Sequence, residues 1–394
     1  MTGGLTSSVK VRRRLVIVFA GVEPVPVVLH CRRFKQEARK VAPLYGMKLA
    51  FDKSRVRSAK PGGVEVGEFV ATASGDGWST RSEIVIFGFG NINAHYAARP
   101  LAARLATGVF AQLDRILTGT LFRYLKANWR YGFFFLFPLV LLGAVTLPFA
   151  VLLAAAIQYL GAVHLVWALP LLVLLWWRSV VAVCARTHLP LVLDLWSFGY
   201  DYARGTRPEV HDMLGATISE AVERARNSDA DEIVFTAHSL GAPPCIEAIA
   251  SALRTNARPV LMTVGSALPA MALHPSARGL REAVRQVAET CPAWLDVQSL
   301  TDIMNFYRTH PTRSLGIEDR GNVHMMTVRF RNQLLPATYQ AIKRDFFRVH
   351  RQFVLGVERP SPYSFHAILC GPERLEDIAR RPGLNTDESR MRPR

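Results

Sequence analysis

The chain has 394 residues, enough for one large α/β domain and an additional segment. Half of the residues are hydrophobic and the mean hydropathy is +0.15, which indicates a locally apolar segment rather than a uniformly water-soluble enzyme. The formal net charge of +17 suits an anionic lipid surface; nucleic acid is not favoured as a partner, because the Arg and Lys residues are scattered and no nucleic-acid-binding motif is visible.

Five cysteines are spread along the chain, at positions Cys31, Cys184, Cys245, Cys291 and Cys370. Their number is odd and no Cys-x-x-Cys pair occurs, so neither a disulfide framework nor a zinc site is indicated. We therefore expect no metal and no cofactor, and buried free thiols in a reducing compartment.

The first predicted element is a strand near 14–20, where Arg12-Arg13-Arg14 is followed by a β-branched run and a Gly turn. A secretion signal is not favoured, because Glu23, Pro24 and Pro26 interrupt the apolar run and no small-x-small cleavage site follows. The pattern continues with a helix near 29–43 and strands near 47–51, 66–72 and 83–88.

A long apolar segment follows, since no Asp, Glu, Lys or Arg occurs between Tyr131 and Trp177. Its length corresponds to two spans of about 20 residues, and we place them near 133–156 and 162–178 with a turn near 158–161. Cations flank the segment on both sides, and the turn is uncharged. The positive-inside rule then places both flanks in the cytoplasm, in a multi-pass protein of the inner (plasma) membrane; a buried helical hairpin in a soluble core is the alternative.

After this segment the pattern predicts a helix near 208–228 and strands near 232–237, 259–265, 294–300 and 323–330. The fold class is therefore α/β, a mainly parallel sheet with helices on both faces, interrupted by a two-helix transmembrane hairpin. The expected organisation is an N-terminal part of the α/β domain (1–130), the hairpin (131–178), a C-terminal part with the catalytic residues (179–375) and a disordered basic tail (376–394).

The most informative motif is Ala237-His238-Ser239-Leu240-Gly241, which directly follows a predicted strand and precedes a predicted helix. A small-x-Ser-x-Gly sequence in this context predicts a nucleophile elbow, in which the serine occupies a strained turn and its neighbours two positions away must be small. We expect Ser239 to be the nucleophile. Ala237 stands where Gly is commoner, and we expect His238 to pack beside the elbow rather than to act as a base.

An acid and a histidine should follow the serine in chain order. Asp302 comes directly after the strand near 294–300, at the edge of the sheet where the elbow also lies, whereas Asp296 lies within that strand and is expected to be structural. Four histidines follow Asp302. His310 and His324 precede or begin the last strand, which leaves His350 as the preferred base and His366 as the alternative. The segment from Tyr339 to Phe353 is predicted to form one amphipathic helix.

An oxyanion hole requires two backbone N–H groups that face the reacting carbonyl oxygen. One is expected from Leu240, the residue after the nucleophile. The first strand ends in the turn Phe19-Ala20-Gly21-Val22-Glu23-Pro24 at the same edge of the sheet, so Gly21 or Val22 is expected to supply the second.

These three motifs, the Phe19–Pro24 turn, the Ala237–Gly241 elbow and Thr301-Asp302, resemble those of the α/β-hydrolase superfamily on its lipase and esterase side. The resemblance covers the segments on both sides of the hairpin. The chain also resembles uncharacterised bacterial membrane-anchored hydrolase-fold proteins, which carry a similar Gly-x-Glu/Asp-Pro turn, a hairpin and an Arg-x-His sequence near the end. The resemblance implies ester or thioester hydrolysis by Ser239, Asp302 and His350 without a cofactor.

The expected function is therefore that of a serine hydrolase that cleaves acyl or lipid-like esters at a membrane. The alternatives are a catalytically inactive hydrolase-fold scaffold or binding protein, and an acyltransferase, which would use the same residues. Acyl length, head group and oligomeric state have no signature in the sequence.

Overall fold

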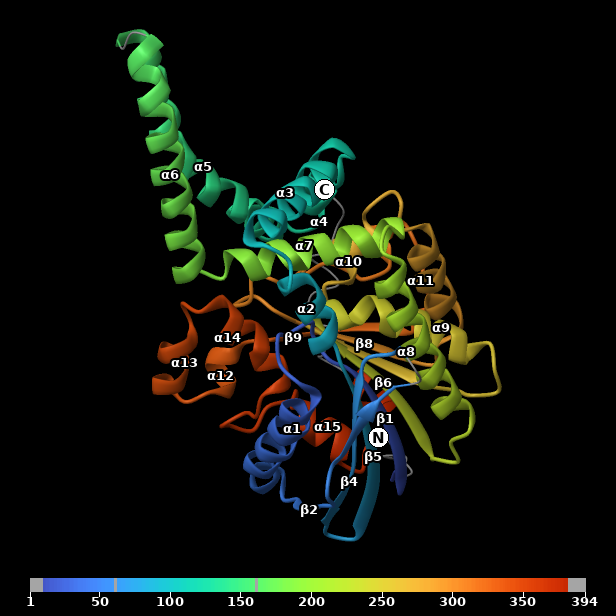
Figure 1. The fold of residues 1–394 in the computed structure, drawn as a ribbon. Helices are drawn as coiled ribbons and strands as arrows, with labels where there is room; N and C mark the ends of the chain where they lie inside the picture. Colours follow the sequence, from blue (N-terminus) through green and yellow to red (C-terminus); the bar gives the residue numbers. More distant parts are fainter. Residues whose placement is uncertain (1–9, 60–61, 160–161, 382–394) are drawn as a thin grey trace.

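A nine-stranded mixed sheet forms the centre of the computed structural model, which describes residues 10–59, 62–159 and 162–381 (Figure 1). The order of the strands is β2-β4-β5-β1-β6-β7-β8-β9, and β3 pairs with β4. All neighbours from β5 to β9 are parallel, whereas β2, β3 and β5 pair antiparallel with β4. The strands are β1 (Arg13–Phe19), β2 (Lys48–Phe51), β3 (Arg55–Ser58), β4 (Glu65–Gly75), β5 (Trp78–Gly88), β6 (Glu232–His238), β7 (Val260–Val264), β8 (Trp294–Ser299) and β9 (Val323–Val328).

The central strands are apolar because both of their faces are covered, as is usual for parallel strands between helices. In β1, Leu15, Ile17 and Phe19 belong to one hydrophobic core, whereas Val16 and Val18 belong to the other. Strands β6, β7 and β8 are buried along their whole length. This burial on both faces holds the carboxyl ends of the strands, where the candidate site lies, in fixed positions.

Helices cover both faces of the sheet. The core on one side includes residues of α2 (Gly90–Ala97), α3 (Leu101–Leu117), α4 (Thr120–Ala127), α7 (Leu189–Arg204), α8 (Pro208–Arg226), α9 (Ala242–Leu253), α10 (Leu268–Ala272) and α11 (Arg278–Thr290). The core on the other side includes residues of α1 (Val27–Val41), α12 (Phe330–Gln333), α13 (Pro336–Ile342), α14 (Phe346–Arg351), α15 (Phe365–Cys370) and α16 (Leu375–Ala379). Short 3-10 turns are η1 (Ala42–Tyr45), η2 (Ser239–Gly241), η3 (Arg313–Leu315) and η4 (Gln352–Val354).

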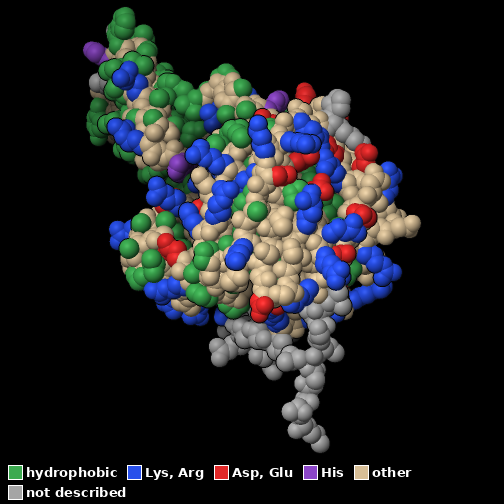
Figure 2. Space-filling view, turned by 90° about the horizontal axis from the view of Figure 1, so that it is seen from below, with side chains coloured by type: hydrophobic (Ala, Val, Ile, Leu, Met, Phe, Trp, Pro, Cys, Tyr) green, Lys and Arg blue, Asp and Glu red, His purple; other side chains and the backbone are tan. Residues whose placement is uncertain are grey.

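Two long apolar helices, α5 (Trp129–Tyr159) and α6 (Ala162–Arg186), leave the domain side by side as a projecting hairpin (Figure 1). By length and composition, both helices could cross a membrane, and almost none of the most apolar stretch of either helix is buried in the protein. Hydrophobic side chains gather on this projection, whereas on the face of the domain that Figure 2 shows Lys and Arg are more frequent than Asp and Glu. The helices extend beyond the predicted spans of 133–156 and 162–178, and the first turns of α5 pack into the domain, where Tyr131 and Phe135 are buried.

The predicted strands and the predicted helices near 29–43 and 208–228 are confirmed to within a few residues at most of their ends. The α/β class with a mostly parallel sheet is likewise confirmed. Strand β3 had not been predicted, because only one of its four residues, Val56, is apolar. Helices α2 to α4 and helix α7 had not been predicted either.

Two predictions near the C-terminus are wrong. The segment from Tyr339 to Phe353 is not one helix but α13 and α14, because the side chain of Asp345 accepts a hydrogen bond from the Arg348 N–H (3.0 Å) and thereby starts a new helix. The expected tail does not begin at 376, because α16 extends to Ala379 and buries Ile378 against the sheet. The remainder of that tail, 382–394, lies outside the described residues.

Candidate functional site

The strained strand-to-helix turn that the sequence predicts at Ser239 is present. Strand β6 ends at His238, η2 begins at Ser239 and α9 follows directly. Ser239 has a φ of 55°, in the left-handed region that a residue with a side chain occupies at a cost of roughly 1–2 kcal/mol. Its carbonyl accepts a hydrogen bond from the Ala267 N–H (3.2 Å), which ties the turn to the segment after β7. The turn is therefore held in a conformation that the chain alone would not favour.

Two glycines allow the end of β1 to lie directly against this turn. A Cβ at Gly241 would lie 2.3 Å from the carbonyl oxygen of Ala20 and 2.5 Å from that of Phe19. A Cβ at Gly21 would lie 2.9 Å from His238 Nδ1 and 3.5 Å from Ser239 Cβ. Since real Cβ atoms do not approach backbone oxygens so closely, position 241 requires glycine at this spacing.

Asp302 and His350 meet although 48 residues separate them in the chain. Asp302 lies just beyond β8 and its side chain is fully buried; one carboxylate oxygen accepts a hydrogen bond from the Met304 N–H (2.9 Å). The other oxygen lies 2.7 Å from His350 Nδ1, on α14. This contact places the proton on Nδ1, which donates to the carboxylate, and leaves the lone pair on Nε2.

The Nε2 atom of His350 is buried and has no hydrogen-bond partner among the described residues. His350 and Ser239 line the same pocket, and Ser239 is 9% exposed. An imidazole nitrogen with a free lone pair thus lies in the compartment that also contains the serine hydroxyl. Geometry of this kind often tightens only when a substrate is bound.

His238 and His366 do not take the position of His350 beside Ser239 and Asp302. His238 is buried beside it with ring centroids 4.6 Å apart, and its Nε2 lies 3.1 Å from the His350 carbonyl oxygen, to which it donates. Burial, followed by the neighbouring His350, lowers the pKa of His238 to about 3, so its ring is neutral. His366 lies on α15 against Phe34, at 4.8 Å between ring centroids, and does not line the pocket of Ser239.

The predicted oxyanion-hole residues also surround Ser239. Gly21, Val22 and Leu240 all line the pocket. Leu240 lies in the first turn after the strand, where backbone N–H groups have no acceptor within the helix. The Val22 N–H has no acceptor in the described part of the chain either, because the turn is closed instead by the Glu23 N–H, which donates to the Gly21 carbonyl (2.8 Å).

The walls of the pocket come from residues that the sequence analysis missed. Tyr131 and Phe134 from the start of α5, and Val192, Leu195 and Trp196 from α7, form its apolar side together with Met304 and Phe347. The pocket is small, with a cavity volume of about 60 Å³. No local motif marks these residues, because their role depends on how α5 and α7 fold back over the sheet. The only signal in the sequence was the position of Tyr131 and Phe134 at the border of the hairpin.

Glu23 was quoted only as part of a turn, but the structure places it between two arginines. Its carboxylate lies 3.3 Å from Arg33 on α1 and 3.2 Å from Arg351, the residue that follows His350. Burial by itself would raise the pKa of Glu23, but Arg33 and Arg351 outweigh it and lower the pKa to about 2. The ion pair therefore joins the turn after β1 to the helix that carries His350.

Comparisons of the chain with models of protein families, with curated proteins and with solved structures found no match. The site must therefore be interpreted from its own geometry.

Proposed function

We propose that the chain is a membrane-anchored serine hydrolase of the α/β-hydrolase type, which cleaves acyl or lipid-like carboxylic esters with Ser239, His350 and Asp302. The observation that carries this proposal is the pairing of a serine at positive φ with a buried imidazole in one pocket. That imidazole has its Nδ1 held by a carboxylate and its Nε2 unpartnered among the described residues.

In the first half of the reaction, Ser239 Oγ attacks the acyl carbonyl carbon while its proton passes to His350 Nε2. The electron pair of the C=O bond moves to the oxygen, which accepts hydrogen bonds from the N–H groups of Leu240 and Val22. The tetrahedral intermediate then collapses, the C–O bond to the alcohol breaks, and the alcohol takes the proton from His350. Asp302 stabilises the imidazolium throughout.

In the second half, water attacks the acyl–serine ester, and His350 accepts a proton from it. Collapse of the second intermediate breaks the bond to Ser239 Oγ, which recovers its proton from His350, and the carboxylic acid leaves. The reaction as written requires no metal or cofactor.

The pocket supports an apolar acyl group as the part of the substrate that is bound. Its walls are mainly aromatic and aliphatic, and the two residues from α5 belong to a helix of the length and composition of a membrane span. In this proposal the hairpin lies in the bilayer and the domain in the cytoplasm, since Arg123, Lys126 and Arg130 precede the hairpin and Arg178 and Arg186 follow the apolar stretch. A substrate dissolved in the membrane then reaches the pocket beside the hairpin.

Labelling of the detergent-solubilised protein with a fluorophosphonate probe tests the chemistry directly. We expect covalent labelling of wild type, none of Ser239→Ala and His350→Ala, and a rate lowered on the order of 10³–10⁴-fold in Asp302→Asn, which would favour the wrong imidazole tautomer. His366→Ala is the matched histidine control and should label at a rate close to that of wild type wherever it remains folded. A circular dichroism spectrum of each variant establishes that its fold is retained.

Folded wild-type protein that does not label would contradict the proposal. So would labelling that persists in Ser239→Ala, because the probe would then react with another nucleophile. Release of free acid from a p-nitrophenyl acyl ester in water, without an added alcohol, then distinguishes hydrolysis from acyl transfer.

A further inference from the structure

Helix α3 has an inverted distribution of polar and apolar residues. Its exposed positions are all apolar and recur at helical spacing, so that they form one stripe: Ala102, Ala106, Phe110, Leu113 and Leu117. Leu117 is 86% exposed and Phe110 is 58% exposed. A helix on the surface of a water-soluble protein shows the opposite pattern, with its polar residues outward.

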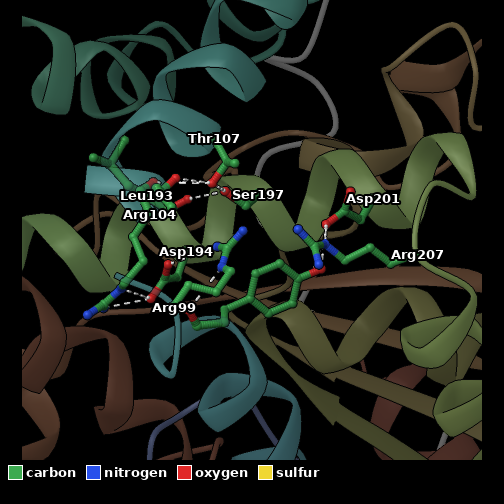
Figure 3. Close-up of polar contacts among 10 residues, drawn as sticks. Arg99, Arg104, Thr107, Leu193, Asp194, Ser197, Asp201 and Arg207 are labelled. Atoms are coloured by element: carbon green, nitrogen blue, oxygen red, sulfur yellow. Dashed lines mark hydrogen bonds and ion pairs between the residues drawn. The ribbon is translucent and has the colours of Figure 1, made fainter. Parts of the chain in front are cut away.

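The polar residues of α3 instead face the protein, on its contact with α7 (Figure 3). Arg104 forms an ion pair with the buried Asp194 through Nη2 (2.7 Å) and Nε (3.0 Å). One helical turn further along, the Thr107 hydroxyl accepts a hydrogen bond from the Ser197 hydroxyl (3.3 Å). Gly108, the residue after Thr107, lies so close to α7 that a Cβ added to it would be 2.5 Å from Leu193 Cβ.

The same inward polarity continues to the end of α3. Gln112 is fully buried and donates to the Phe135 carbonyl of α5 (2.5 Å), and Arg115 is buried and donates to the Ala111 carbonyl (2.8 Å). The inward face of α3 is therefore specified by an ion pair and a hydrogen bond with α7 and by a hydrogen bond to α5. Because these contacts fix the rotation of the helix about its axis, the apolar stripe cannot turn inward.

The exposed apolar surface continues from α3 to the start of the hairpin. Phe122 on α4 is 70% exposed, and Trp129 and Phe133 in the first turns of α5 are 63% and 62% exposed. Figure 1 shows α3 and α4 on the same side of the sheet as the hairpin. Arg123, Lys126 and Arg130 lie among these residues, as cations commonly do at the boundary between hydrocarbon and lipid head groups.

We infer that the outer face of α3 lies in the lipid interface, as a second contact with the bilayer beside the hairpin. The inference rests on the membrane placement of the hairpin proposed above. A helix in this position lies along the surface with its apolar side among the head groups and upper acyl chains. We assign lipid rather than a second protein to this surface, because it leads to α5. That helix is apolar on all sides, and its most apolar stretch is not buried in the protein.

Two contacts with one bilayer would fix the orientation of the domain, which a hairpin alone leaves free to rotate. Helix α7 lies between α3 and the sheet, and Val192, Leu195 and Trp196 on it line the pocket of Ser239. The contact of α3 with lipid therefore holds the apolar wall of the pocket close to the membrane surface, where an acyl chain can leave the bilayer.

Site-specific labels in reconstituted full-length protein test this inference. The five native cysteines are all buried, so an environment-sensitive NBD dye can be attached to single introduced cysteines: Leu113→Cys and Leu117→Cys on α3, Val151→Cys on the hairpin, and the exposed Thr290→Cys on α11. Wild-type protein gives the background. Vesicles contain phosphatidylglycerol and phosphatidylcholine, with either ordinary or brominated acyl chains.

We expect brominated lipid to quench the dye at 113, 117 and 151 but not at 290, and aqueous iodide to quench only the dye at 290. Quenching at 151 together with iodide quenching at 113 and 117 would overturn the inference and leave the anchor in place. Shielding of 113 and 117 from both quenchers would also overturn it, because a protein would then cover α3. An unquenched dye at 151 would show that the hairpin is outside the lipid, so that the anchor proposed above fails together with the inference.

Discussion

The contact between Gly241 and the end of β1 leads to the sharpest stability prediction. The backbone of Gly241 has φ −73° and ψ −14°, a helical conformation that any residue can adopt. Replacement by alanine therefore adds no conformational strain, and its whole cost is the overlap of the new Cβ with two carbonyl oxygens at 2.3 and 2.5 Å. Neither oxygen can move away easily, because β1 is bonded to β5 on one side and to β6 on the other.

Overpacking in a core that can adjust costs about 1–3 kcal/mol. Since the obstacle here is backbone in the middle of a sheet, we expect Gly241→Ala to lower the free energy of unfolding by about 3 kcal/mol or more. For a protein of this size that corresponds to a melting temperature lower by about 4 °C or more. The displaced turn should also carry Ser239 away from His350, so that fluorophosphonate labelling becomes slower or is lost.

Gly215→Ala is the matched control. Gly215 lies within α8, and a Cβ there would have no neighbour within 4 Å. We expect this variant to be more stable than wild type by about 0.5–1 kcal/mol and to label normally. The melting temperatures of both variants and of wild type are measured in detergent by the change in tryptophan fluorescence on heating, and labelling rates are measured on the same samples. Melting of Gly241→Ala within a degree or two of wild type, with unchanged labelling, would refute the packing of the turn against β1.

Three further predictions concern the same region. Ser239→Gly should be more stable than Ser239→Ala by about 1 kcal/mol, because only glycine adopts a φ of 55° without strain; equal melting temperatures would contradict the strained turn. Burial lowers the pKa of His366 to about 3, so between pH 6.5 and 3 the unfolded chain binds a proton that the folded chain does not, and stability falls with decreasing pH. His366→Leu should therefore reduce the slope of unfolding free energy against pH by up to about 1.4 kcal/mol per unit in that range, as urea titrations at several pH values would show; an unchanged slope would count against a neutral buried ring. Phe134→Leu, which alters the apolar wall, should raise KM for long-chain p-nitrophenyl esters several-fold more than for the acetate, at about 0.8 kcal/mol per methylene that loses contact; equal effects on both esters would place the acyl chain elsewhere.

The sheet was predictable because its strands carry strong local signals, namely β-branched runs that end in glycine or polar turns. The serine turn and the position of Asp302 followed from the same signals, since residues just beyond parallel strands meet at one edge. The choice between His350 and His366 could not be made with the same assurance, because both lie in short helical segments with aromatic residues and neither segment follows a strand directly. Only the contact between α14 and the loop after β8, where His350 Nδ1 lies 2.7 Å from the Asp302 carboxylate, shows which of them reaches Asp302.

The walls of the pocket were not predictable for a different reason. Helix α3 does not line the pocket but packs on α7, which does; it has polar residues inward and apolar residues outward, so the usual rule for a surface helix assigns its faces wrongly. The start of α5 was expected to belong wholly to the hairpin, whereas Tyr131 and Phe134 line the pocket. In the membrane placement proposed above, the outer face of α3 and most of α5 contact a second apolar environment, which a pattern of hydrophobic residues does not distinguish from the core.

The pairing of β1 has a consequence for how the protein is made. Strand β1 lies between β5 and β6, which are encoded on opposite sides of the hairpin. At a synthesis rate of roughly 5–20 residues per second, on the order of ten seconds pass between completion of β5 and completion of β6. During that interval one edge of β1 has no partner strand, while α5 and α6 are already emerging from the ribosome. In the membrane placement proposed above, the hairpin is therefore available for insertion before the sheet closes, and a delay in insertion would leave the β1 edge open to aggregation.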